Sequence, residues 1–170
     1  MKPAGTLRLF LALWPDDGAR AALARCRDAW DWDAGASPEP TARLHLTLHF
    51  LGAVRQLRLP ELIEGLKART NPFALCLDQT QRWPNGVAVL APKAAPPGLL
   101  ALHAALRDGL ECLDLATETR RYRPHVTLAR RVGDSAAPAQ TSPVHWPVSG
   151  YALVESHPVT GEYVMLRHFG

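Results

Sequence analysis

In this chain of 170 residues cysteines are few, no apolar segment is long, and neither acidic nor basic residues strongly predominate. The three cysteines, Cys26, Cys76 and Cys112, are odd in number and lack Cys-x-x-Cys spacing, which argues against a disulfide framework and a zinc knuckle. No apolar run approaches the length that crosses a bilayer, and the N-terminus lacks the features of a secretory signal. We therefore expect a cytoplasmic protein with no membrane partner.

The overall charge is nearly balanced, because the chain has 19 Lys and Arg residues and 16 Asp and Glu residues, which gives a net charge of +3. Arginines nevertheless gather in one region, at Arg120, Arg121, Arg123, Arg130 and Arg131. Such a cluster suits a phosphate-bearing ligand, although it is also typical of a solvated surface. The length and the hydrophobic fraction of 47% predict one domain over residues 1–170, which we expect to be a monomer.

The stretch Arg43–Gly52 alternates polar and apolar residues with a period of two, which predicts a half-buried strand. The alternation places His45, Thr47 and His49 on one face, which we expect to line a cleft or the surface. The opposite face is expected to be core and carries Leu44, Leu46, Leu48 and Phe50.

The same pattern returns once, in the later run Arg123-Pro-His-Val-Thr-Leu-Ala. There His125 and Thr127 share one face, while Val126 and Leu128 share the other. A single His-x-Thr strand is often an accident of an amphipathic surface. A matched pair favours function, because two histidines that titrate near neutral pH can supply one acid and one base.

The remaining elements repeat one order, strand, helix and motif strand. Leu7 and Val87 begin the two copies, and the interval from Leu7 to His45 equals the interval from Val87 to His125. This repeat predicts two similar lobes related by an approximate two-fold axis, with the motif strands face to face across a central cleft. Other strands are predicted at 73–83, 148–155 and 163–168, and helices at 16–30, 60–70 and 97–115.

A phosphodiester in such a cleft would meet the groups that its cleavage requires. Two histidines on opposite sides of phosphorus can act as acid and base without a metal. The hydroxyls of Thr47 and Thr127 can donate to the non-bridging oxygens. Arg130, five residues past His125, can add a fixed positive charge, and its neighbour Arg131 competes for that role.

With these motifs the sequence resembles the 2H phosphoesterases, and most closely their RNA 2′,3′-cyclic phosphodiesterases, also called 2′-5′ RNA ligases. The resemblance rests on the opening run from Arg8 to Pro15, the tail Phe50-Leu51-Gly52 of the first motif, the run from Arg123 to Arg130 and the final hairpin. It implies an α+β fold of two lobes, in which antiparallel sheets line the central cleft and helices lie outside.

The same resemblance implies a reaction and a role for each site residue. The reaction is the hydrolysis of RNA 2′,3′-cyclic phosphate ends to 2′-phosphates, with no metal and no cofactor. His45 would be the general acid for the leaving 3′ oxygen and His125 the base that activates water. Thr47 and Thr127 would hold the phosphate, and Arg130 would assist. Residue types alone leave the order of acid and base open.

Three other interpretations remain open. A metal site on His45 and His49 is disfavoured, because four residues along a strand span about 13 Å. An enzyme that joins RNA through 2′-5′ bonds, or cleaves linear 2′-5′ or 3′-5′ linkages, would use the same acid and base. A non-catalytic RNA binder would require neither histidine. We expect His49 to be solvated and Phe50 to point into the core.

Overall fold

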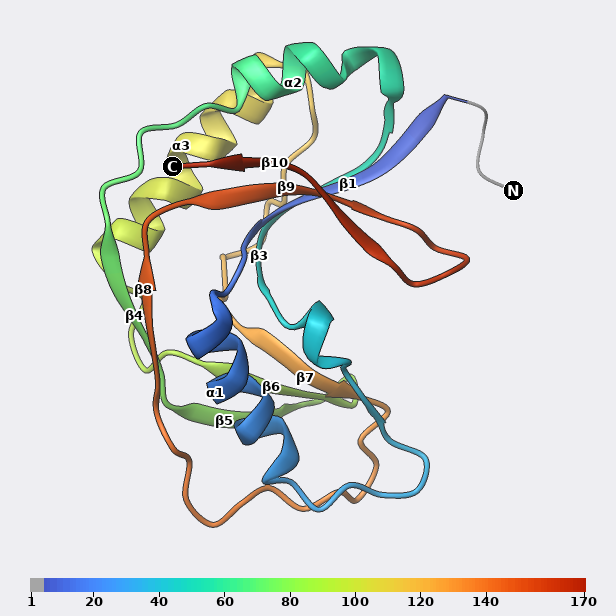
Figure 1. Ribbon diagram of the computed structural model, residues 1–170, viewed down its shortest axis with the longest axis vertical. Helices are drawn as coiled ribbons and strands as arrows, with labels where there is room; N and C mark the ends of the chain where they lie inside the picture. The colour runs from blue at the N-terminus through green and yellow to red at the C-terminus, as the bar shows by residue number, and fades with distance from the viewer. Residues whose placement is uncertain (1–4) are drawn as a thin grey trace.

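The computed structural model describes residues 5–170 and shows an α+β fold (Figure 1). An eight-stranded antiparallel sheet has the order β10-β9-β1-β3-β7-β6-β5, with the short β2 paired to β7, and β4 and β8 form a separate two-stranded sheet. The strands are β1 (Thr6–Leu13), β2 (Ser37–Pro38), β3 (Leu46–Arg55), β4 (Phe73–Leu77), β5 (Gln79–Trp83), β6 (Val87–Ala91), β7 (Val126–Arg130), β8 (Val144–Val148), β9 (Tyr151–Ser156) and β10 (Tyr163–Phe169).

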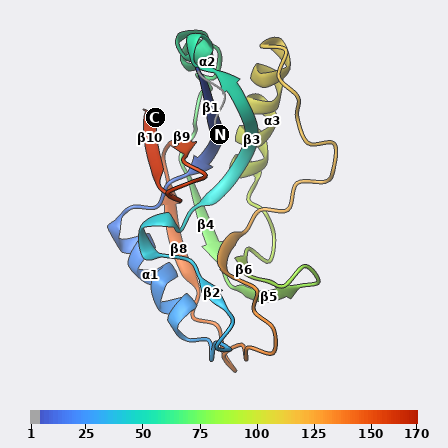
Figure 2. The same cartoon turned by 90° about the vertical axis from the view of Figure 1, so that its right-hand side faces the viewer.

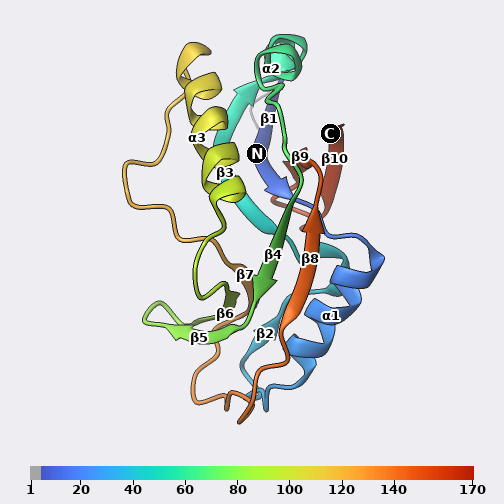
Figure 3. The ribbon, with the colours of Figure 1, turned by 90° about the vertical axis from the view of Figure 1, so that its left-hand side faces the viewer.

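The α-helices of the described residues lie on the outside of these sheets, as predicted (Figures 2 and 3). They are α1 (Asp17–Asp28), α2 (Leu59–Gly65) and α3 (Pro97–Cys112), and single turns of 3₁₀-helix cover Thr41–Arg43 and Gln56–Arg58. Helix α1 begins after Asp16, whose Oδ1 accepts a hydrogen bond from the Ala19 N–H at 2.7 Å. Its buried side chains Ala19, Leu23 and Cys26 face the core, so the helix predicted in this region is confirmed.

The strand ladders of the two lobes join at a single residue pair. Strands β9, β1 and β3 form one half of the large sheet, and β7, β6 and β5 form the other. Between β3 and β7 the ladder contains only the pair Leu46 and Val126, the residues that directly follow His45 and His125. The approximate two-fold axis therefore passes beside the two histidines.

The lobes are arranged as predicted, but two details of the prediction are wrong. The motif strands lie edge to edge in one sheet rather than face to face across a cleft. The equal spacing predicted for the two copies is also wrong. Leu46 pairs with Leu13 in the first copy, and Val126 pairs with Leu90 in the second. The interval between Leu13 and Leu90 is shorter than the interval between Leu46 and Val126, so only the element order repeats.

The stretch 73–83, predicted as one strand, divides at Asp78 into β4 and β5, which join different sheets. Asp78 holds this corner, since its N–H donates to the Ala91 carbonyl at 3.2 Å and its carboxylate accepts from the Lys93 N–H at 3.0 Å. Strand β4 pairs with β8, in a segment whose strand the sequence interpretation did not include. Alternate residues of β8 are buried, so the period-two signal was present there.

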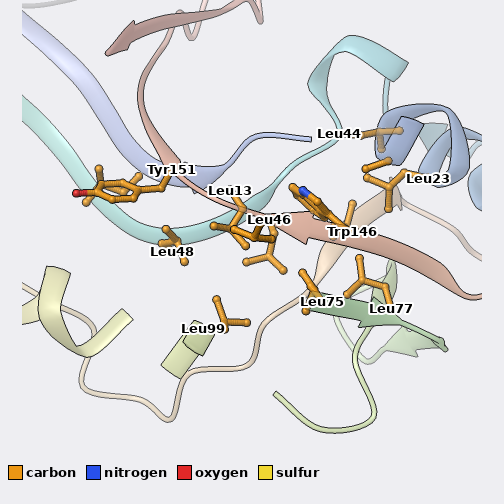
Figure 4. Close-up of a cluster of buried hydrophobic side chains, with 14 of the residues drawn as sticks. Leu13, Leu23, Leu44, Leu46, Leu48, Leu75, Leu77, Leu99, Trp146 and Tyr151 are labelled. Atoms are coloured by element: carbon orange, nitrogen blue, oxygen red, sulfur yellow. The ribbon is translucent and has the colours of Figure 1, made fainter. Parts of the chain in front are cut away.

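One continuous hydrophobic core extends under both lobes and includes Leu46 and Val126. Figure 4 shows part of it, where Trp146 from β8 lies among leucines from β1, β3, β4, α1 and α3. Because the lobes share this core, they are held together by packing as well as by the single strand pair. No helix within residues 5–170 is long and apolar enough to span a membrane.

Leu46 is fully buried at the junction of the lobes, so its truncation is expected to destabilise the whole fold. Leu46→Ala should lower the free energy of unfolding by about 2–5 kcal/mol, the usual effect of emptying a leucine site in a packed core. Urea denaturation measures this change. The control is Leu57→Ala, because Leu57 is 92% exposed and its loss should leave the unfolding midpoint unchanged.

Candidate active site

Both motif strands contain a β-bulge at the same place, one residue after the threonine. In β3 the partners of His49 and Thr47 are the consecutive residues Leu11 and Ala12, so Leu48 is the extra residue. In β7 the partners of Ala129 and Thr127 are likewise consecutive in β6, so Leu128 is the extra residue. A bulge reverses which face the following residues occupy.

The bulge in β3 makes two predictions wrong. His49 is turned into the protein and is only 4% exposed, rather than solvated beside His45. Phe50 is 63% exposed and lies on the side of the motif residues, 6.2 Å from the ring of Phe10, rather than in the core. In β7 the same reversal places Arg130 on the face of His125. Arg130 follows His125 by the same number of residues as Phe50 follows His45.

The two motif histidines are oriented in the same way. The Nδ1–H of His45 donates to the Arg43 carbonyl at 2.6 Å, and that of His125 donates to the Arg123 carbonyl at 2.7 Å. Each carbonyl acceptor fixes the tautomer of its imidazole, because only a protonated Nδ1 can donate. In both rings Nε2 is therefore the atom that can exchange a proton with a ligand.

His45 lies in an aromatic pocket. Its ring stacks on Trp14 at 5.7 Å between centroids and contacts Phe10 at 5.0 Å and Tyr163 at 5.3 Å. Burial lowers the pKa of His45 to about 4; the hydrogen bond to the Arg43 carbonyl opposes this, and the charges of Arg43, Arg20 and His125 lower it further. The unliganded site thus holds His45 neutral at pH 7.

His125 lies nearer to solvent and contacts Trp83, with ring centroids 4.3 Å apart. The guanidinium of Arg123 lies over the same indole at 4.3 Å. Burial lowers the pKa of His125, the Arg123 carbonyl opposes that change, and the charges of Arg123 and Arg130 add to it.

The two threonines lie beside their histidines, as the alternation predicted. The Oγ1 of Thr47 is 3.0 Å from Nε2 of His45, and neutral Nε2 can accept its hydroxyl proton. Thr127 is partly buried, and within residues 5–170 its hydroxyl has no protein hydrogen-bond partner. A ligand between the two strands would therefore find the Thr127 hydroxyl free to donate.

Glu39 links the two halves of the site, and sequence reasoning missed it. Its carboxylate accepts a hydrogen bond from Nε of Arg130 at 3.2 Å and lies 3.8 Å from Nε of Arg43. Arg43 also donates to the Tyr163 hydroxyl at 3.1 Å. Arg131, the competitor of Arg130, takes φ = 52° where β7 has ended, so the chain leaves the sheet there.

A repeated signal could have identified the arginine before each histidine. Arg43 and Arg123 both stand two residues before the motif histidine, so the repeat of the motif includes them. Each provides the carbonyl that orients the imidazole, and each guanidinium lies over an aromatic ring, Tyr163 or Trp83. No comparable sequence pattern marks Glu39.

A second group of rings lies behind β3. His49 stacks on His103 at 4.0 Å, and His103 stacks on Tyr122 at 3.8 Å. His49 Nε2–H can donate to the His103 carbonyl at 2.9 Å, and the Tyr122 hydroxyl donates to the Thr47 carbonyl at 2.9 Å. These contacts attach the segment between α3 and β7 to the first motif strand.

The described residues do not gather the side chains of a metal site. No group of three or more His, Cys, Asp and Glu side chains between residues 5 and 170 is placed to hold an ion. His45 and His49 point to opposite faces of β3 because of the bulge, so they cannot bind the same metal ion. The three cysteines are free thiols, Cys26 buried and the other two exposed.

Comparison with known proteins agrees with this geometry. The family model of the 2′-5′ RNA ligase superfamily matches residues 15–159, which include both His-x-Thr strands. The chain belongs to the 2′-5′ RNA ligase superfamily. A curated member of similar sequence, the RNA 2′,3′-cyclic phosphodiesterase of Thermus thermophilus, is 36% identical over 96% of this chain and 89% of its own length.

Solved structures show the same 2H phosphoesterase fold. A crystal structure of a phosphoesterase superposes with a TM-score of 0.86 at 26% identity, covering 96% of this chain and 97% of that one. The E. coli LigT complex with 3′-AMP superposes with a TM-score of 0.81 at 28% identity, covering 96% and 97%. This superfamily member is therefore an enzyme, and its fold is the one that the resemblance implied.

The buried histidines make the stability of this superfamily member depend on pH. Burial lowers the pKa of His45 and of His103 to about 4 and also lowers that of His49. The unfolded chain, with histidine pKa values near 6.5, takes up these protons first as the pH falls. The free energy of unfolding should therefore decrease from about pH 6.5 down to about pH 4.

Urea titrations across that pH range measure the loss, which we expect to reach about tenfold or more in the unfolding equilibrium constant. The variant His49→Gln/His103→Gln removes two of the three groups and should show a flatter dependence. His145→Gln is the control, since His145 is exposed. If the free energy of unfolding changed with pH equally in the double variant and the wild type, His49 and His103 would not be the cause of the pH dependence.

Proposed function

We propose that the enzyme hydrolyses RNA 2′,3′-cyclic phosphate ends to 2′-phosphates. The observation that carries this proposal is the matched pair of imidazoles, His45 and His125, each held by a main-chain carbonyl so that Nε2 serves the site. The name of the Thermus thermophilus relative supports the substrate class. RNA or a nucleotide with a cyclic phosphate is thus the proposed partner.

In the proposed reaction water attacks phosphorus on the side of His125. Nε2 of His125 has no protein hydrogen-bond partner within residues 5–170, so it can take the proton of the water. The bond between phosphorus and the 3′ oxygen breaks, and Nε2–H of His45 donates its proton to that oxygen. The products are a 2′-phosphate and a 3′-hydroxyl.

His45 must carry a proton when substrate is bound. Its pKa of about 4 belongs to the unliganded site, where burial opposes a charge. A phosphodiester anion beside the ring stabilises the imidazolium and raises this pKa. Substrate binding thus prepares the acid, whose Nε2–H then faces the 3′ oxygen, and the Thr47 hydroxyl, 3.0 Å from Nε2, is left to donate to a phosphate oxygen.

The oxygens that gain charge are stabilised by groups of both strands. The Thr127 hydroxyl is free to donate to a non-bridging oxygen, and Thr47 lies at the equivalent place of the other lobe. Arg130 contributes positive charge on the side of His125, with Nε held by Glu39 and its terminal nitrogens left for the ligand. On the other side the exposed ring of Phe50 offers a surface for the terminal base.

We also infer that residues 1–170 act as a single domain in the cytoplasm. The continuous core under both lobes supports the first inference, and three free cysteines fit a reducing compartment. That the domain is a monomer stays a prediction.

The proposal predicts the product of a defined reaction. A short RNA with a 2′,3′-cyclic phosphate end should be converted to a 2′-phosphate end, with a bell-shaped dependence of kcat/KM on pH. His45→Ala and His125→Ala should each lower kcat by about 10²–10⁴-fold, because each removes one proton transfer. Separation of the labelled RNA ends measures both effects.

The control for these variants is His145→Ala, which removes an exposed histidine of β8 and should retain full activity. Formation of a 2′-5′ linkage between two RNAs, with no 2′-phosphate product, would identify a ligase instead. Turnover that persists in the double variant His45→Ala/His125→Ala would exclude both histidines from catalysis. RNA binding without turnover by the wild type would identify a binding protein.

Hydrolysis is also expected to survive metal chelation, because the proposed acid, base and charge-stabilising groups are all side chains of this protein. The measurement compares the initial rate before and after exhaustive treatment with EDTA. Loss of activity that zinc restores would show that the proposed mechanism lacks an essential component.

A further inference from the structure

A basic groove borders the site on the side of His125. It has a volume of about 880 Å³ and lies between α3, the segment that joins α3 to β7 and the hairpin of β5 and β6, which share one side of the molecule in Figures 2 and 3. Five cationic side chains line this groove, and no Asp or Glu side chain does: Lys93, Arg107, Arg120, Arg121 and Arg123. None of the site residues proposed from the sequence lies in it.

We infer that this groove binds the RNA strand on the 5′ side of the cyclic end, so that the preferred substrate is an oligonucleotide. The inference rests on the proposed function and adds a second binding region to it. Its supports are the position of the groove on the sheet, its unpaired cations and the aromatic residue at its inner end.

The strand register places the groove on the same sheet face as the motif residues. Thr127 of β7 pairs with Val89 of β6, and Val89 pairs with Gln81 of β5, so these three side chains share one face. Gln81 lines the groove, as does Ala91, two residues after Val89. An RNA strand leaving the site over β7 would therefore pass across β6 toward β5.

Trp83 connects the groove to the site. Its ring contacts His125 at 4.3 Å and also lines the groove, beside the guanidinium of Arg123. Its indole N–H donates to Oε1 of Gln81 at 2.9 Å, which holds the ring in place. A fixed, partly exposed indole beside cationic groups is the usual arrangement for stacking a base of a single strand.

Most cations of the groove lack a partner of opposite charge. Arg120 pairs with Glu118 at 3.2 Å, but no such pair involves Lys93, Arg107, Arg121 or Arg123 within residues 5–170. The Nε of Arg107 is buried and makes no hydrogen bond. Its positive charge also lowers the pKa values of His49 and His103 behind it. Bound phosphates would supply the missing negative charge.

The experiment compares two substrates, a cyclic mononucleotide and a trinucleotide with the same cyclic end. The measured quantity is the ratio of kcat/KM for the trinucleotide to kcat/KM for the mononucleotide. We expect this ratio to exceed about tenfold in the wild type and to fall at least about tenfold in Lys93→Gln/Arg107→Gln/Arg121→Gln, since each lost phosphate contact weakens strand binding. Raising the salt concentration should lower the wild-type ratio in the same direction.

The matched control is Arg25→Gln/Arg69→Gln/Arg167→Gln, which removes three positive charges at exposed positions outside the groove. It should keep the wild-type ratio. A second variant, Lys93→Gln/Arg121→Gln, changes only exposed side chains and guards against misfolding caused by the loss of Arg107.

An unchanged ratio in both groove variants, or an equal fall in the control, would overturn the inference. Equal hydrolysis of both substrates by the wild type would overturn it as well. If the wild type hydrolyses neither substrate, the proposed function fails. In that case the affinity of each variant for the trinucleotide tests the groove. Weaker binding by the groove variants than by the control supports the inference, and equal binding overturns it.

Discussion

The pairing of Leu46 with Val126 is the interaction on which the arrangement of the site depends. It is the single point at which the ladders of the two lobes join, and each partner directly follows a motif histidine. Backbone hydrogen bonding between antiparallel strands fixes their spacing at about 5 Å. The two imidazoles are therefore placed relative to one another by the backbone, and the buried core beneath them keeps that pair closed.

The site is also organised by the removal of water and by charge balance. Aromatic rings enclose His45, and burial lowers its pKa to about 4. Glu39 accepts from Arg130 and lies near Arg43, so one carboxylate offsets two guanidinium groups that would otherwise repel across the lobe boundary.

Most strands, the α-helices and both His-x-Thr pairs could be predicted, because each depends on local periodicity that survives in the fold. The strand β8 and the break at Asp78 were missed. Periodicity did not reveal which of the side chains after each motif lie on the same sheet face as the histidines. The extra residues Leu48 and Leu128 carry no distinguishing chemistry, since a bulge is set by how two strands pair. Phe50 and His49 were assigned to the wrong faces for this reason, and Glu39 joins the site through a long-range contact with Arg130.

Main-chain carbonyls, rather than side chains, orient the two imidazoles. Substitution at position 43 or 123 removes a guanidinium but leaves the carbonyl that accepts the Nδ1 proton. The tautomer of each imidazole and the charge beside it are thus set by different parts of the same residue. A change of side chain at either position therefore alters the charge beside the imidazole without altering its tautomer.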